Sequence, residues 1–267
     1  MKRKPAVAGT FYEGGAKALR AQIGALADPK APKEPVLGAM APHAGYVYSG
    51  PVAGAVYSRI KPADTFIILG PNHTGLGADA AVFQKGSWEL PFGEALIDET
   101  LGAALLEASR DLAPDDRAHI SEHSIEVQVP FLQFFFDNIK ILPICLGRLD
   151  LKKCMDIGKA IARVIKGRQE KIAIIASSDM SHYVSRETAE KKDRLALDAM
   201  EALDPDRLYE VVLKNRISMC GFIPAVCMLS ACNELGAKRA FLVKYATSGD
   251  VSGDYGQVVG YAGLIIQ

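Results

Sequence analysis

The strongest constraint on the fold is a series of short apolar runs rich in valine and isoleucine, which alternate with stretches of helical spacing. Residues 65–69 are apolar almost throughout, as expected for a strand that is covered on both faces. Further strands are predicted at 36–41, 139–146, 171–176, 239–246 and 258–266. Helices are predicted at 16–27, 51–60, 99–109, 122–136, 151–166, 187–203, 205–214 and 223–235. This alternation predicts an α/β fold with a largely parallel central sheet flanked by helices.

Residues 78–97 interrupt this rhythm. Short alternating pieces at 80–84, 87–90 and 95–97, set around Gly86 and Gly93, predict an antiparallel excursion. We find no linker, internal repeat or low-complexity segment that would divide the chain. One domain spanning residues 1–267 is therefore expected.

Charge and cysteine content limit the classes of partner and the compartment. The chain has 31 basic and 31 acidic side chains, a balance that argues against nucleic acid or an anionic membrane surface as the main ligand. It lacks an apolar run of the ~20 residues that a membrane span needs, and its basic start is not followed by the apolar region of a signal peptide. Five cysteines without a CxxC pair suggest neither a disulfide framework nor a structural zinc cluster, so a cytoplasmic protein is expected. Neither a Walker A pattern nor a GxGxxG motif after a strand is present, so no nucleotide is implied.

Three of the five histidines follow predicted strands. His43 comes after 36–41, His73 after 65–69, and His182 after 171–176. Ligands of open parallel sheets bind beyond the carboxyl ends of the strands, so these histidines are expected to share one site; each alone could instead be an ordinary loop residue. Neutral imidazoles suit Zn, Fe or Cu, and the absence of HExxH argues against a zincin-type protease.

Two acidic segments are candidates to support that site. Glu122 is expected in the first turn of a helix, where His123 and Glu126 would share a face as an acid–base pair or proton relay. The alternative is an ordinary capped, solvated helix start. Asp179 lies on the same loop as His182 and could orient an imidazole or take a proton, or could simply form a turn.

Among the cysteines, Cys220 is the functional candidate. It lies just before the helix predicted at 223–235, where the helix terminus lowers the pKa of a thiol and makes it a ligand or nucleophile. The other four cysteines are expected in the core.

These motifs together resemble the Memo family in the same order along nearly the whole chain. The matching segments are Ala8-Gly9-Thr10-Phe11-Tyr12, Ala41-Pro42-His43-Ala44-Gly45-Tyr46, Gly70-Pro71-Asn72-His73, Glu122-His123-Ser124-Ile125-Glu126, Ser177-Ser178-Asp179 with His182, and Cys220-Gly221 with Pro224. The resemblance implies a fold similar to the class III, non-haem iron, extradiol ring-cleavage dioxygenases, with the site at one edge of the sheet.

The resemblance also implies roles for the site residues. His43, His73 and His182 match the family's three site histidines: the first two as ligands, and His182 as a proton-transfer residue or third ligand. Cys220 matches the family's site cysteine and falls where the dioxygenases have a carboxylate. A thiolate is a softer ligand than a carboxylate and alters metal preference and redox chemistry.

The leading hypothesis is a metal-dependent redox or dioxygenase-like protein with Fe(II) or Cu, in which Tyr46, Asn72 and Glu126 contact a small-molecule substrate. Tyr48 is a further candidate to line the pocket. One alternative is a non-catalytic module that binds a peptide or partner in the same crevice, as the signalling association of animal members implies. Another is a zinc hydrolase, since three histidines plus water are a common catalytic zinc site. The sequence does not indicate the oligomeric state.

Overall fold

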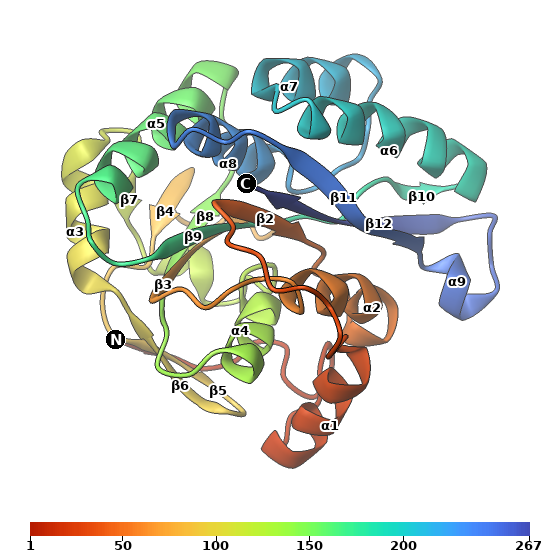
Figure 1. Cartoon of the computed structure of the whole chain (residues 1–267), viewed down its shortest axis with the longest axis horizontal. Coiled ribbons are helices and arrows are strands. Elements are labelled where there is room, and N and C mark those ends of the chain that lie inside the picture. The colour runs from red at the N-terminus through yellow and green to blue at the C-terminus, as the bar shows by residue number, and fades with distance from the viewer.

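A mixed sheet runs through the molecule, with helices packed against both of its faces (Figure 1). The computed structural model describes residues 1–267. The strands are β1 (Lys2–Arg3), β2 (Gly38–Ala41), β3 (Thr65–Pro71), β4 (Ala80–Val82), β5 (Ser87–Leu90), β6 (Gly93–Ile97), β7 (Ala113–Pro114), β8 (Lys140–Leu146), β9 (Ile172–Ser177), β10 (His182–Val184), β11 (Ala240–Thr247) and β12 (Val258–Ile266). The α-helices are α1 (Ala16–Leu26), α2 (Tyr46–Tyr57), α3 (Glu99–Ala108), α4 (Val129–Phe135), α5 (Leu151–Lys166), α6 (Arg186–Glu201), α7 (Pro205–Lys214), α8 (Phe222–Glu234) and α9 (Gly249–Ser252). Two 3-10 turns, η1 (Arg117–His119) and η2 (Glu126–Gln128), precede α4.

The centre of the sheet is parallel, as predicted. Strands β6, β8, β3, β9 and β2 lie side by side in that order and run in the same direction. Strand β12 pairs antiparallel with β2, and β10 and β11 pair antiparallel with β12. Every residue of β2 and β3 is buried, which accounts for their unbroken small or apolar sequences.

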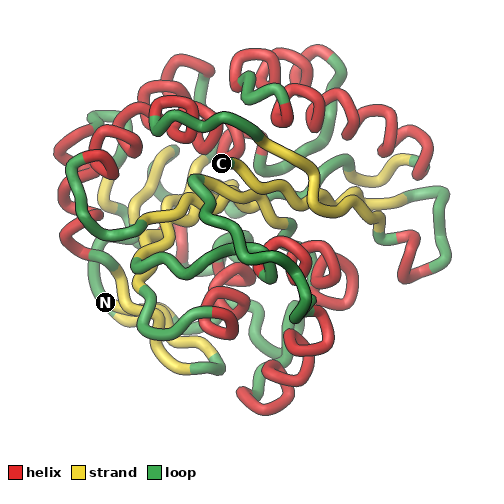
Figure 2. Tube along the Cα trace, viewed as in Figure 1, coloured by secondary structure: helices red, strands yellow, loops and turns green.

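The two faces of the sheet carry different helices (Figures 1 and 2). Helices α1, α2 and α4 pack together on one face, and α2 contacts β2, β11 and β12. On the other face α8 contacts β2, β3 and β9, while α5 packs between α8 and α3. The buried apolar side chains form one core of 68 residues, as expected for a single α/β domain. No helix combines the length and the apolar character that crossing a membrane would require.

Residues 78–97 form the expected antiparallel excursion, since β5 pairs antiparallel with β6 and β4 pairs antiparallel with β8. The helix predicted at 122–136 was wrong in its first half, because α4 begins only at Val129. Instead of the expected helix start, the Glu122 carboxylate accepts the backbone N–H groups of Ser124 and His73, which holds an irregular loop. The helix predicted from residue 51 begins earlier, at Tyr46, whose N–H donates to the Phe11 carbonyl.

Candidate metal centre

The carboxyl ends of β2, β3 and β9 lie at one edge of the sheet and deliver two of the expected histidines to one place. The three strands are adjacent and parallel, and His43 and His73 each lie two residues beyond a strand end. Their ring centroids are 5.2 Å apart, edge to face. The predicted convergence of these two histidines is therefore confirmed.

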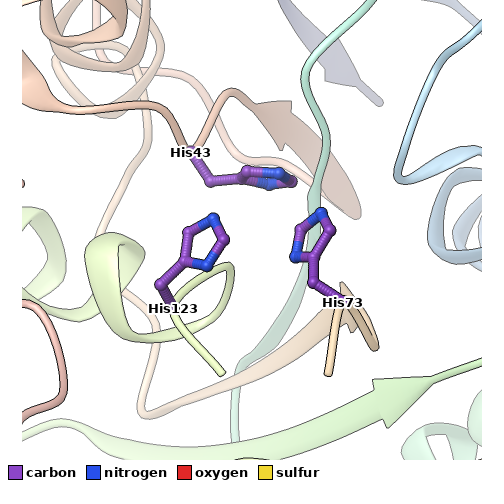
Figure 3. A group of neighbouring side chains, drawn as sticks. All are labelled: His43, His73 and His123. Carbon is purple, nitrogen blue, oxygen red and sulfur yellow. The ribbon is translucent and has the colours of Figure 1, made fainter. Parts of the chain in front are cut away.

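The third histidine of the cluster is His123. One ligand atom from each of His43, His73 and His123 lies within 4.8 Å of the other two (Figure 3). His123 stands on the irregular loop between η1 and η2, and its ring stacks on that of His73 at a centroid distance of 4.7 Å. The sequence pattern placed His123 on a helix as an acid–base residue, whereas the structure groups it with the two strand-end histidines.

His182 does not join this cluster, which corrects the expectation that three strand-end histidines converge. It begins β10, where it pairs antiparallel with Val259 of β12. Its backbone N–H donates to Ser218 Oγ, and its Nδ1 lies 2.9 Å from the Ser218 carbonyl oxygen. His182 still lies near enough for its charge to affect the pKa values of His43 and Asp179, and its proposed role in proton transfer stays a prediction.

Hydrogen bonding fixes the protonation of His43. Ser177 Oγ donates to the Ser124 carbonyl at 2.6 Å and accepts from Gln128 Nε2 at 2.8 Å. Its contact of 2.9 Å with His43 Nδ1 must therefore be a second accepted bond, with the proton on Nδ1. Burial and the neighbouring histidines lower the pKa of His43 well below its ordinary value. The ring is thus neutral, and the Nε2 lone pair is directed away from Ser177.

A carboxylate fixes the tautomer of His73, with the proton on Nδ1. Glu122 is buried and accepts His73 Nδ1–H at 2.8 Å and the His73 backbone N–H at 2.6 Å. Burial lowers the pKa of His73, but the hydrogen bond and charge of Glu122 outweigh burial and raise it overall. Although burial opposes ionisation of Glu122, the same pairing brings the pKa of that carboxyl down to about 2. Such a carboxylate–histidine pair is the usual support for a metal-binding imidazole.

His123 completes the set as a neutral imidazole. Burial lowers the pKa of His123, which outweighs the attraction of Glu122. Its Nδ1 lies 3.6 Å from Glu122 Oε1, beyond a normal hydrogen bond, and its ring contacts that of Phe11. Neutral nitrogen donors suit Fe, Cu or Zn, so the residues present fit a metal ion.

Cys220 lies beside the cluster, with Sγ 3.1 Å from His43 Nε2. The expectation of a lowered thiol pKa was wrong: burial and the Asp179 carboxylate raise the pKa of Cys220. The protonated thiol can donate to the Nε2 lone pair, and its position is compatible with a fourth ligand if it loses that proton to a metal.

Asp179 supports His43 through the main chain. Asp179 Oδ1 accepts the His43 backbone N–H at 2.7 Å and makes no bond to an imidazole. Burial raises the pKa of Asp179 to about 6, against the effect of that hydrogen bond.

The three expected substrate contacts lie in different places. Tyr46 is buried, and its hydroxyl donates to the Val127 carbonyl at 2.6 Å. Glu126 is fully buried, and its carboxylate accepts bonds from Arg3, Tyr12 and two backbone N–H groups. Asn72 lies at the cleft that leads to His73, but its Nδ2 is bonded to the Leu76 carbonyl. Tyr46 and Glu126 therefore support the site through hydrogen bonds inside the protein.

Sequence reasoning missed the supporting residues Gln128 and Arg3 and the part that Ser177 plays. Ser177 stands within the Ser-Ser-Asp segment that ends β9, which was a detectable signal, but Arg3 offered none. Its guanidinium reaches the backbone carbonyls of His119 and Glu122 only in the folded chain.

Comparison with known proteins gives one consistent result. The family profile described as Memo-like protein matches residues 3–265. A MEMO1 family protein of Methanococcoides burtonii is 46% identical over 99% of this chain and 100% of its own length. Another, from Aquifex aeolicus, is 42% identical over 98% of each chain. The crystal structure of an uncharacterized protein from Escherichia coli K12 superposes with a TM-score of 0.60 over 85% of this chain and 98% of that one; at 12% identity it shares the fold alone.

Proposed function

We propose that this chain, which belongs to the Memo-like protein family, is a metal-dependent oxidoreductase. In this proposal His43, His73 and His123 hold an iron or copper ion. The observation that carries the proposal is the grouping of three imidazoles with ligand atoms within 4.8 Å of one another. Nδ1 of His43 and of His73 is engaged by a hydrogen-bond acceptor, so Nε2 of each is the available donor.

The chain's own residues prepare this site in three ways. Ser177 and Glu122 hold two imidazoles in the tautomer that a metal requires. Asp179 fixes the backbone at His43. Cys220 places a sulfur atom next to His43 Nε2, where it can give up its proton and serve as a soft ligand.

A bound iron or copper ion would supply one-electron chemistry and leave coordination positions for oxygen or a small substrate. The adjacent sulfur favours these metals over a purely hard-ligand ion. Three histidines alone also resemble catalytic zinc sites, so zinc-dependent hydrolysis is the second candidate.

The test is elemental analysis of protein prepared without oxygen, together with His43→Ala, His123→Ala and His182→Ala. We expect about one equivalent of iron or copper in the wild type. The ion should be lost from the first two variants and retained in His182→Ala, which is the matched control because His182 lies outside the cluster. Circular dichroism establishes that each variant is folded.

Other outcomes contradict the proposal in different ways. Zinc alone, with hydrolytic but no redox turnover, would establish the second candidate. No metal after anaerobic reconstitution would leave a non-catalytic binding module. Loss of metal from His182→Ala but not from His123→Ala would return the third ligand position to His182.

A further inference from the structure

A cleft of about 700 Å³ opens beside the histidine cluster. His73 and Cys220 are among the residues that line it, so a molecule bound against them lies next to the proposed metal. The cleft runs from the ends of β3 and β8 to α7 and the start of α8. Apart from Asn72, His73 and Cys220, the residues that line the cleft do not belong to the site described above.

One wall of the cleft is apolar. It is formed by Leu149, Tyr209, Leu213, Phe222 and Ile223. The rings of Tyr209 and Phe222 lie 5.7 Å apart and inclined to each other, and Leu213 is 54% exposed although it is a leucine. An apolar wall of this kind favours a ligand with an apolar body.

The strand register brings a cation to the same edge as His73. Pro71 of β3 pairs with Leu146 of the parallel strand β8, so His73 and Arg148, each two residues further on, occupy equivalent positions. Arg148 is the only lysine or arginine that lines the cleft. No carboxylate of the chain forms an ion pair with it, in contrast to Arg3, Arg168, Arg186 and Arg194.

Asp79 also lines the cleft and restricts what Arg148 can bind. The backbone carbonyl of Asp79 accepts the Gly147 N–H, so Asp79 lies beside the residue that precedes Arg148. The Asp79 carboxylate opposes the binding of any anion in the cleft, so an anion is expected only where its head group contacts the Arg148 guanidinium directly.

We propose that this cleft binds a small amphipathic anion. Its carboxylate or phosphate head group contacts Arg148, its apolar body lies along the wall that includes Leu213 and Phe222, and its other end reaches His73 and Cys220. This proposal rests on the proposed function only where it names the anion as the substrate class of the metal site. Binding of the anion in the cleft does not itself need the metal.

The test is titration calorimetry of the full chain with 4-phenylbutyrate, its uncharged amide and phenyl phosphate. The amide should bind at least about tenfold more weakly than the acid, as loss of a charge-assisted hydrogen bond predicts. Arg148→Gln should weaken the two anions by a similar factor and leave the amide unchanged. The tighter of the two anions identifies the head group. Arg110→Gln, an exposed arginine outside the cleft, is the matched control.

Two further variants test the body of the ligand and the sign of the charge. Leu213→Ser should weaken acid and amide equally, because it removes apolar contact only. Asp79→Asn should strengthen binding of the acid. The proposal is overturned if acid and amide bind equally, if nothing binds, or if Arg148→Gln binds like the wild type. Binding that persists after the metal is removed with a chelator supports the cleft even if the metal proposal fails.

Discussion

A serine hydroxyl and a glutamate carboxylate each accept a hydrogen bond from the Nδ1 of one of two neighbouring histidines. Ser177 Oγ and Glu122 Oε1 each engage a ring Nδ1, at 2.9 and 2.8 Å. The carboxylate adds a charge, so His73 has a raised pKa while His43 has a lowered one. The two rings thus present the same nitrogen with different basicity.

Replacing Glu122 should weaken the metal centre without removing a ligand. In Glu122→Gln the side chain can still accept from His73 Nδ1, but it loses the charge that raises the basicity of the imidazole. We expect metal affinity to fall by about 10- to 100-fold, measured by competition with a chelator. Glu94→Gln, an exposed glutamate outside the cluster, should leave affinity unchanged, and an unaltered affinity in Glu122→Gln would contradict this role.

The buried His119 is expected to make the folded protein less stable in acid. It is fully buried, its Nδ1 has no hydrogen-bond partner, and burial lowers its pKa to about 4. The pKa of His119 in the folded protein lies below the unfolded value of 6.5. The contribution of neutral His119 to the free energy of unfolding is therefore complete above pH 6.5 and is lost as the pH falls towards 4. The loss should approach about 3 kcal/mol.

Urea unfolding at pH 7 and pH 4.5 checks this. His119→Gln should lose less stability on acidification than the wild type. Equal losses in the two proteins would show that His119 does not titrate in this way.

At the scale of elements, glycine sets how closely two helices approach. A Cβ added to Gly158 of α5 would lie 2.5 Å from Ser230 Cβ and 2.6 Å from the Cys227 carbonyl of α8. Helix α8 covers the centre of the sheet and begins just after Cys220, so this contact also sets the position of the site.

Gly158→Ala should therefore destabilise the protein by about 1–3 kcal/mol through overpacking, despite the better helix propensity of alanine. Gly24→Ala in α1 is the matched control, since its nearest neighbour would be an ordinary 3.8 Å contact with Phe134. That variant should be as stable as the wild type or up to about 1 kcal/mol more stable. The free energies of unfolding from denaturant titration decide; a Gly158→Ala variant as stable as the Gly24→Ala variant would show that α5 and α8 can separate at little cost.

At the scale of the whole molecule, the N-terminal segment is tied to the site loop across more than a hundred residues. Arg3 is 2% exposed, and its guanidinium pairs with Glu126 at 2.7 Å and stacks over the Trp88 ring. The same guanidinium donates from Nε to the His119 carbonyl, from Nη2 to the Glu122 carbonyl and from Nη1 to the Lys4 carbonyl. The loop that carries His123 is thus held at both ends.

Arg3→Ala should cost about 3–5 kcal/mol of stability, because it leaves the Glu126 carboxylate buried without a counter-ion. Adding Glu126→Gln should recover part of that loss, since the unpaired charge is then gone. Lys2→Ala, which removes an exposed pair with Glu94, should change little. Thermal and urea unfolding of the four proteins provide the comparison, and a loss in Arg3→Ala no larger than in Lys2→Ala would rule out this account.

The sequence by itself determined most of the elements, though not the irregular loop before α4, and it determined two of the clustered histidines. Residues 65–69 and 141–146 are largely apolar because both faces of a central strand are covered. The ends of parallel strands meet at one edge of the sheet, so His43 and His73 were expected to be neighbours. His123 instead of His182, the protonated thiol of Cys220 and the Arg3–Glu126 pair were decided only by the tertiary structure. Periodicity reports which face of an element is buried, whereas these features depend on loop conformation, burial and partners that are distant in the chain.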